Sequence, residues 1–277
     1  RRAFVREAWV ASQAETLTCR LGIGPHAPYK PAPRHLDTMS DLPRYTPRTL
    51  FQSDSRMPQW MASRERATQA EVDLTRQRQY EALQSVDDLV ATIDRTLEQT
   101  GRSRNTLFIF TSDNGYFWGE HRIIGKDSPY RDSTAVPMVL RWDGRTPAGE
   151  RSAKLVLNVD IAATIAAAAR VRMPTDGINM LGPRRRGGFV LEAMEGYHAR
   201  PPYCGWRTKH RMYVRWATGE EELYDYRNDP YEQRNLADRK RHADLKARMR
   251  ALAEQACVPV PPGFRWKSAT WQPSFQW

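Results

Sequence analysis

The sequence predicts an α/β fold in which a mostly parallel sheet is flanked by helices, with a small α+β subdomain at its C-terminal end. Three observations predict it. A long amphipathic helical pattern precedes a strongly apolar run at residues 106–111, an Ala-rich helical segment follows that run, and short strand-like segments begin after residue 188. Helices that alternate with apolar strands are typical of layered α/β domains. The 277 residues, 40% of them hydrophobic, suffice for one large domain or a medium domain with a smaller one.

The first part of the chain is expected to contain a strand, a loop and a long helix. Residues 1–14 are interpreted as the end of a helix, and Leu17–Ile23 as a strand. Four prolines between residues 24 and 34 exclude regular helix there. An amphipathic helix is predicted over residues 69–100, with Gly101 as its C-terminal cap. Its apolar face is formed by Leu83, Val86, Val90, Ile93 and Leu97.

The central part is expected to supply the sheet. Thr106–Thr111 is apolar on both faces, which favours a central parallel strand covered by helices on both sides. Two more strands are predicted at Val136–Trp142 and Leu155–Val159. A helix is predicted at Asp160–Arg170, and Asp160 is interpreted as its structural N-terminal cap.

The composition changes near residues 184–188, so we divide the chain into a first domain, residues 1–185, and a second, residues 186–277. The second domain is predicted to form antiparallel strands and then a charged helix at about residues 238–256. The strands are Phe189–Met194, Arg207–Ala217 and Glu222–Tyr226, and the helix buries Leu245, Met249 and Leu252.

The charge pattern does not indicate a specific nucleic-acid partner. The formal net charge is +11, but 36 of the 43 basic residues are Arg, and they are scattered along the whole chain. A genome-wide preference for Arg explains this more simply than a surface that tracks phosphates, while an anion-attracting surface stays open. No apolar run reaches the length of a membrane span, so no transmembrane segment is expected.

The cysteines do not indicate a metal site. Cys19, Cys204 and Cys257 share no metal-binding or redox spacing, and an odd number makes a disulfide framework unexpected. Cys204 is interpreted as a structural residue. No cellular compartment follows from these features.

Polar residues follow the predicted central strand at Ser112-Asp113-Asn114-Gly115. Ligands of open α/β sheets gather at the carboxyl ends of the strands, which is where Asp113 and Asn114 fall. A carboxylate beside an amide oxygen offers two donors of the type that Ca²⁺ or Mg²⁺ prefers. Four residues alone are also compatible with an ordinary Asp-Asn-Gly turn.

A longer motif favours the metal site over the turn. The run SDNGYFWGEHRIIGK, residues 112–126, resembles the sulfatase signature, and it is most similar to the branch that contains arylsulfatases and N-acetylglucosamine-6-sulfatases. The resemblance spans roughly residues 15–237, with the motifs in the family's order. Its further segments are residues 129–133, 136–142, 222–226, 229–230 and 235–237, together with a histidine loop at residues 25–34.

The resemblance implies an alkaline-phosphatase-like fold and hydrolysis of aryl or sugar sulfate esters with a divalent metal, usually Ca²⁺, with Mg²⁺ as the alternative. Asp113 and Asn114 fall on two metal ligands. Lys126 falls on the lysine that holds the sulfate and assists the leaving group, and His26 on the histidine that contacts the sulfate. His121 is a weaker candidate for substrate contact. A cation, an ammonium and an imidazole aimed at the sulfate oxygens would stabilise the charge of the transition state.

Each of the side-chain assignments has a structural alternative. Lys126 could be a solvated surface residue, His26 could cap a turn, and His121 could orient the loop rather than touch the substrate. The aromatic residues Tyr116, Phe117 and Trp118 could stack on a sugar or an aryl ring, or could pack in the core.

The family's nucleophile is a formylglycine made from Cys or Ser in a C-x-P-S-R or S-x-P-x-R motif, and this sequence contains neither motif. The aspartate pair that completes the family's metal site is absent from it too. We therefore expect the chain to be the C-terminal portion of a longer sulfatase or the product of a truncated gene, and to be inactive by itself. Two alternatives remain: a non-catalytic remnant that binds sulfated glycans, and a related phosphoester or phosphonate hydrolase. The second is disfavoured because those relatives tend to carry Asp-His where this chain has Asp113-Asn114.

Overall fold

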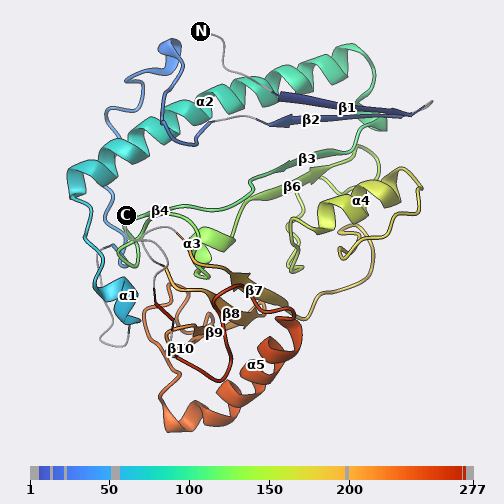
Figure 1. Ribbon diagram of the computed structural model, residues 1–277. Coiled ribbons are helices and arrows are strands. Elements are labelled where there is room, and N and C mark those ends of the chain that lie inside the picture. The colour runs from blue at the N-terminus through green and yellow to red at the C-terminus, as the bar shows by residue number, and fades with distance from the viewer. Residues whose placement is uncertain are drawn as a thin grey trace.

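The computed structural model describes residues 6–12, 15–21, 24–50, 57–196, 200–269 and 271–272. The chain is a mixture of helices and strands in three layers (Figure 1). The long helix α2 lies along one side, the strands β3 and β6 lie in the middle, and a four-stranded sheet with helix α5 lies on the opposite side. The motif of residues 112–126 directly follows β3 of the middle layer.

Helix α2, Gln69–Gln99, confirms the helix predicted from the amphipathic pattern. It begins with a capping box, because the Thr68 side chain accepts a hydrogen bond from the Glu71 backbone and the Glu71 carboxylate accepts one from the Thr68 backbone. It ends just before Gly101, whose φ of +66° is the left-handed conformation of a C-terminal cap. The predicted apolar face is only partly covered, since Leu83 is exposed.

Strands β3, Phe108–Thr111, and β6, Met138–Arg141, lie at the predicted positions but not in the predicted arrangement. They pair antiparallel, with Phe108 opposite Arg141 and Thr111 opposite Met138, and every strand pairing among the described residues is antiparallel. The mostly parallel sheet is therefore not confirmed. The chain reverses between β3 and β6 through the short elements β4, β5 and α3 rather than through a crossover helix, which parallel pairing would need. These elements are Phe117–Trp118, Ile124–Gly125 and Arg131–Thr134.

Two other predicted elements are wrong. Residues 6–12, expected in a helix, form strand β1, Arg6–Ser12, which pairs antiparallel with β2, Glu15–Leu21. Strand β2 confirms the strand predicted at Leu17–Ile23 as far as Leu21, and residues 1–5, 13–14 and 22–23 lie outside the described residues. Residues 155–159 form no strand, because they lead directly into a helix without a pairing neighbour among the described strands. Apolar runs this short do not distinguish these structures by periodicity.

Helix α4, Asp160–Ala168, is present where it was predicted, and Asp160 has a structural role of a different kind. Its carboxylate is fully buried and accepts hydrogen bonds from the backbone nitrogens of Leu157 and Ile178, both at 2.9 Å, and from the Arg186 guanidinium. Asp160 therefore ties two loops together instead of capping its own helix. Within the described residues, the remaining short helices are η1 Pro33–His35, α1 Gln59–Ala62, η2 Ser103–Asn105 and η4 Lys240–His242.

The C-terminal part forms the predicted antiparallel sheet and helix, with one strand more than expected. The strand order is β10-β9-β8-β7, and the strands are β7 Phe189–Ala193, β8 Tyr203–Arg207, β9 Arg211–Trp216 and β10 Glu221–Asp225. The predicted strand at Arg207–Ala217 is in fact the end of β8, a turn and β9. Helix α5, Ala243–Ala256, starts five residues later than predicted, and Leu252 is 41% exposed although Met249 is buried as expected.

This sheet is covered on both faces, and one face packs against the segment that follows β3. Met212, Val214 and Trp216 of β9 pack in one core with Phe117, Ile123 and Tyr130 from the middle layer. Tyr213 of β9 and Leu223 of β10 pack in a second core with Met249 and Ala253 of α5. The alternation of side chains along a strand produces these two faces. The segment around residues 117–130 is thus held against the C-terminal sheet by buried apolar contacts.

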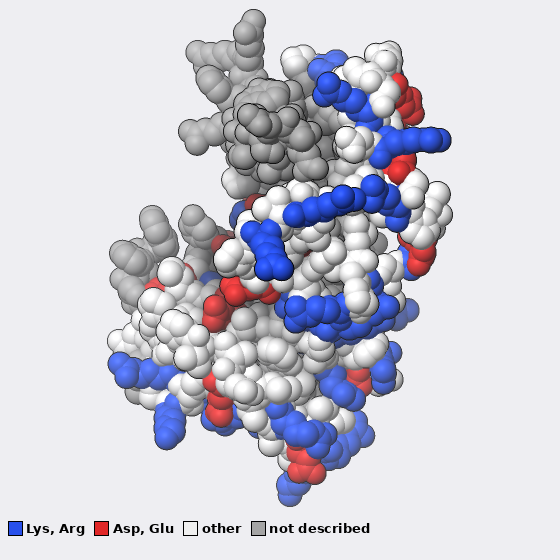
Figure 2. Space-filling model, turned by 90° about the vertical axis from the view of Figure 1, so that its right-hand side faces the viewer, with Lys and Arg blue, Asp and Glu red and all other residues white. Residues whose placement is uncertain are grey.

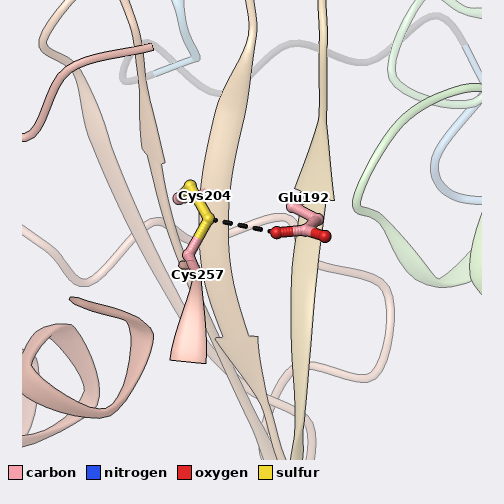
Figure 3. Close-up of a disulfide and its surroundings, with 3 residues drawn as sticks. All are labelled: Glu192, Cys204 and Cys257. Carbon is pink, nitrogen blue, oxygen red and sulfur yellow. Dashed lines mark hydrogen bonds between the residues drawn. A yellow bond between two sulfur atoms is a disulfide. The ribbon is translucent and has the colours of Figure 1, made fainter. Parts of the chain in front are cut away.

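The structure corrects the expectation that the cysteines form no disulfide. Cys204 in β8 and Cys257 at the end of α5 are joined, with a Cα–Cα distance of 6.1 Å, and a Glu192 carboxylate oxygen lies 3.3 Å from the Cys257 sulfur (Figure 3). The two cysteines are 53 residues apart in the chain, and no local sequence pattern indicated that they would pair. Cys204 therefore has the predicted structural role, because it links the sheet covalently to the end of α5.

The distribution of basic side chains on the surface agrees with their scattered distribution along the sequence. On the face shown in Figure 2, Lys and Arg side chains form several separate groups with acidic residues between them, rather than one continuous stripe. Among the described residues, no helix is both long enough and apolar enough to cross a membrane.

Candidate active site

The loop after β3 holds Asp113 and Asn114 on a fixed backbone. Asn158 donates from Nδ2 to the backbone oxygens of Ser112 and Asp113, at 3.1 Å each. The Ser112 hydroxyl donates to the Asn114 backbone oxygen at 2.9 Å, and the Asn114 backbone nitrogen donates to Asp113 Oδ1 at 2.9 Å. The Asp113 side chain is exposed and Asn114 is half-buried. Two oxygen-bearing side chains are therefore presented side by side from a loop whose backbone is anchored.

Gly115 fixes this loop against helix α3. Its backbone nitrogen donates to the Ser133 backbone oxygen at 2.8 Å, and a Cβ at this position would stand 2.0 Å from the Asp132 backbone oxygen. Only glycine permits so close an approach of two backbones. The backbone directly after Asn114 is therefore in close contact with the α3 turn.

Lys126 reaches the same place from the other end of the motif. It follows β5 and Gly125, whose φ is +107°, and its Nζ donates to Asn114 Oδ1 at 3.1 Å. An ammonium can donate only to the amide oxygen, so this contact also fixes the orientation of the Asn114 amide, whose Nδ2 donates to the Gly115 oxygen at 2.9 Å. The structure thus brings together Asp113, Asn114 and Lys126, three of the five residues predicted for the site.

The loop that carries His26 is attached to the same segment by a tyrosine pair. Tyr29 and Tyr116 share a hydrogen bond between their hydroxyls at 2.6 Å, with their rings edge to face. His26 itself is exposed, and its Nδ1 lies 2.8 Å from the Ala27 oxygen. Among the described contacts, no hydrogen bond links His26 to Asp113, Asn114 or Lys126. Its role in contacting sulfate stays a prediction.

His121 lies on the opposite side of the motif, against the C-terminal sheet. It is 5% exposed, its ring stacks on Tyr130 with centroids 4.6 Å apart, and its Nε2 is 3.9 Å from a Glu232 carboxylate oxygen. Burial lowers the pKa of His121 to about 4, so the ring is neutral at neutral pH. This environment favours the interpretation that His121 orients the loop over the one in which it touches the substrate.

A tight turn and packing explain the neighbouring residues. Gly119, His121 and Arg122 all have positive φ values, and buried Glu120 accepts a hydrogen bond from the Trp118 backbone at 2.6 Å. Phe117 is fully buried. Trp118 contacts α2, donating from Nε1 to Gln79 and stacking on Tyr80. These contacts favour packing over ligand stacking for the aromatic residues of the motif.

A cavity of about 1160 Å³ lies beside His121. Its lining includes Met61, Tyr224 and Glu232 and the basic segment of residues 239–241, but not Asp113, Asn114, Lys126 or His26. Although large concave pockets are the usual place to seek an active site, here the residues with the relevant chemistry lie elsewhere. We therefore place the candidate active site at Asp113, Asn114 and Lys126.

Sequence reasoning missed several residues that build this site. Three of them make contacts between residues distant in the chain: Asn158 bonds to Ser112, Tyr29 to Tyr116, and Glu232 to Arg131 next to the site loop. Asn158 stands just before an aspartate that opens a helix, which is a weak local signal for a loop anchor. Glu232 gave no signal, because a buried carboxylate cannot be told from a surface one in a charged segment.

The donors present fit part of a site for a hard cation. Asp113 offers carboxylate oxygens and Asn114 an amide oxygen, the ligand types of Ca²⁺ and Mg²⁺. Within the described ranges, no group of three or more His, Cys, Asp and Glu side chains is placed to hold a metal ion. Ca²⁺ takes roughly six to eight oxygens, so this pair would need further ligands.

The decisive comparison is with protein families. Residues 23–171 match the model of the sulfatase family. The chain belongs to the sulfatase family. This match contains His26, Asp113, Asn114, His121 and Lys126.

Individual sulfatases show the same relationship. The chain is 32% identical to an arylsulfatase of Volvox carteri over 80% of its own length and 41% of the relative's. It is 30% identical to human N-acetylglucosamine-6-sulfatase over 60% of its length and 31% of the relative's. The chain thus spans less than half the length of these curated relatives.

Solved structures agree at the level of the fold. BT4656, solved in complex with its substrate D-glucosamine-2-N,6-O-disulfate, superposes with a TM-score of 0.61 at 26% identity, over 66% of this chain and 40% of that one. A phosphonate monoester hydrolase of Agrobacterium radiobacter superposes with a TM-score of 0.57 at 23% identity, over 68% and 41% of the two chains. The second likeness concerns the fold alone.

Proposed function

We propose that the protein containing this chain hydrolyses sulfate esters, with Asp113, Asn114, Lys126 and His26 as its site residues. The contact that carries this proposal joins Lys126 Nζ to Asn114 Oδ1 at 3.1 Å. It places a cation beside two hard oxygen donors within the sulfatase motif of a sulfatase-family chain. With a divalent cation bound to the oxygen donors, such a site would attract a tetrahedral anion, which is not expected of a simple turn.

Each residue has a defined task in this proposal. Asp113 and Asn114 would hold a divalent cation, Ca²⁺ in our proposal, which supplies positive charge at the sulfate oxygens. Lys126 places its ammonium on the same oxygens and stabilises the charge that develops on the leaving oxygen. Its flexible stem carries a point charge that suits a tetrahedral anion. The exposed imidazole of His26 is available to donate to the sulfate from the loop that Tyr29 attaches to Tyr116.

We propose a sugar or aryl sulfate as the substrate class. The support is similarity to an arylsulfatase and an N-acetylglucosamine-6-sulfatase, and to BT4656, which was solved with a sulfated glucosamine. The nucleophile of this reaction would come from a formylglycine motif outside the present sequence. We propose further that residues 1–185 belong to an alkaline-phosphatase-like catalytic domain and residues 186–277 to a separate subdomain.

A phosphonate or phosphate ester hydrolase is the second candidate, because the Agrobacterium enzyme shares the fold. Asn114, at the position where those relatives tend to carry histidine, favours the sulfatase. A binding protein for sulfated glycans is the third candidate, and the net charge of +11 favours it. Strong retention of the 277-residue chain on a heparin column, combined with an inactive complete protein, would support that candidate.

The metal pair provides the direct test of the proposed site. In the complete protein, Asp113→Ala and Asn114→Ala should each lower bound Ca²⁺ and remove most sulfatase activity, because each deletes an oxygen ligand. Metal content measured by mass spectrometry and sulfate release from an aryl sulfate check this together. An Asp113→Ala protein with unchanged metal content and turnover would return the pair to the turn interpretation.

A further inference from the structure

Two buried carboxylates of the C-terminal part contact the segment that packs against the candidate active-site loop. Glu232, in the loop after β10, is 2% exposed and has a left-handed backbone with φ of +56°. Its Oε2 accepts a hydrogen bond from the Arg131 backbone nitrogen at 2.9 Å, and its Oε1 accepts one from the Tyr226 hydroxyl at 2.8 Å. Glu222 of β10 is 1% exposed and accepts a hydrogen bond from the Tyr130 hydroxyl at 2.8 Å.

Both carboxylates therefore act on one short segment, residues 130–134, which contains α3. A third contact comes from Arg207 of β8, which donates to the Thr134 hydroxyl. The Arg131 nitrogen belongs to the first turn of α3, where backbone donors have no partner inside the helix. Glu232 supplies the missing acceptor from a distant part of the chain, which fixes where α3 begins.

The α3 segment in turn holds the active-site loop. The Ser133 oxygen accepts from the Gly115 nitrogen at 2.8 Å, and the contact between Gly115 and Asp132 leaves no room for a Cβ. Gly115 directly follows Asn114, and Asn114 Oδ1 accepts from Lys126. A continuous series of hydrogen bonds and covalent neighbours thus runs from Glu232 through α3 to the two metal-ligand candidates.

We propose that Glu232 is a positioning residue that sets the placement of Asp113 and Asn114 through the α3 turn. The functional part of this inference rests on the proposed function of the site, whereas the mechanical part concerns the fold alone. Glu232 does not touch the site residues and acts on them through Arg131, Ser133 and Gly115. In this proposal, the C-terminal part of the chain supports the loop that carries the two metal-ligand candidates.

Glu221 offers a matched control in the same strand as Glu222. Its carboxylate is less deeply buried and accepts hydrogen bonds from Tyr213 and from Lys246 of α5, on the other face of the sheet. Glu232→Ala and Glu221→Ala therefore remove comparable interactions on opposite sides of the sheet. Glu232→Gln keeps an acceptor for the Arg131 nitrogen and a polar partner for Tyr226.

Hydrogen exchange of the 277-residue chain, followed by mass spectrometry, tests the mechanical part without metal or substrate. Glu232→Ala should accelerate exchange in residues 112–118 about tenfold, the ratio that corresponds to about 1.4 kcal/mol. Glu221→Ala should accelerate exchange in α5 instead, and Glu232→Gln should stay close to wild type. If Glu232→Ala does not fold, Glu232→Asp replaces it, because the shorter side chain cannot reach the Arg131 nitrogen. Unchanged exchange in residues 112–118, or equal acceleration there in the Glu221 variant, would overturn the proposal.

Steady-state kinetics of the complete protein tests the functional part. Glu232→Ala should lower kcat more than it changes KM, since the site is displaced and no substrate contact is removed, and Glu232→Gln should restore kcat. Glu221→Ala should leave both constants near wild type. If Asp113→Ala fails to reduce turnover, the proposed function is wrong. If it does reduce turnover while Glu232→Ala behaves like Glu221→Ala, only the positioning role is wrong.

Discussion

Lys126 and Asn114 stand twelve residues apart and meet through a single hydrogen bond. This hydrogen bond places Lys126 beside Asn114, and this position distinguishes it from the other basic side chains of the chain. Lys246, by contrast, is bound to Glu221 at 3.0 Å on helix α5. The two lysines therefore share chemistry and differ in location, which makes them a useful pair.

The Lys126 interaction should be strongest in the transition state, when charge moves to the leaving oxygen. In the complete protein, Lys126→Ala is expected to lower kcat/KM by roughly 10²–10³, the range for removal of one preorganised charge-stabilising donor. Lys126→Arg should recover little, because a planar guanidinium places its donors differently. Lys246→Ala should leave kcat/KM unchanged. Equal losses at the two lysines would mean that basic residues act only as a diffuse field.

At the scale of elements, the C-terminal sheet is fastened on both faces. One face packs on the motif segment through Phe117, Ile123 and Tyr130, and the other on α5 through Met249 and Ala253. The disulfide between Cys204 of β8 and Cys257 adds a covalent link to the second face (Figure 3). Helix α5 and the sheet therefore form a covalently linked base for the segment that follows the candidate active-site loop.

Removal of this link should weaken the whole base. Cys204→Ala opens a loop of 53 residues, for which the chain-entropy estimate is about 4 kcal/mol of lost stability. Urea unfolding of wild type and variant, each with and without reductant, measures the difference. Reductant should lower the stability of the wild type to nearly that of the variant, and it should leave the stability of the variant unchanged. Equal stability of the two proteins without reductant would show that the disulfide does not form.

At the scale of the whole molecule, buried acids make stability depend on pH. Burial raises the pKa of Glu222 to about 7, against hydrogen bonds from Tyr224, Trp216 and Tyr130 that lower it. A carboxyl whose pKa is higher in the folded state contributes stability that is fully present below about 4.5 and is lost as pH rises through about 7. His121, whose pKa is lowered to about 4, acts in the opposite direction between about pH 4 and 6.5.

Glu222→Gln isolates the contribution of the acid, because the His121 effect is common to both proteins. Between pH 5.5 and 8, wild type should lose about 2 kcal/mol more of its unfolding free energy than the variant, from about 1.4 kcal/mol per pKa unit. Urea unfolding at the two pH values gives this difference. Identical pH dependence in wild type and variant would show that Glu222 keeps an ordinary pKa in the folded protein.

The sequence allowed prediction of those features whose signals are local. Helix α2 followed from its periodicity and cap, and the candidate site residues Asp113, Asn114 and Lys126 were proposed from a motif within 15 residues. The direction of β3 could not be predicted, because an apolar run is the same in parallel and antiparallel sheets. The Cys204–Cys257 link and the contacts of Glu232 depend on residues brought together from distant positions, so no local pattern carried them.

Relative turnover of sulfate and phosphonate esters tests the central claim, that this site belongs to a sulfatase. The complete protein would be assayed with an aryl sulfate, an aryl phosphate and a phosphonate monoester that share one leaving group, beside the 277-residue chain. We predict that the sulfate ester has the highest kcat/KM, that chelation of the metal removes this activity, and that the 277-residue chain shows none. Preference for the phosphonate or phosphate ester, or robust turnover by the 277-residue chain after repurification, would contradict the account.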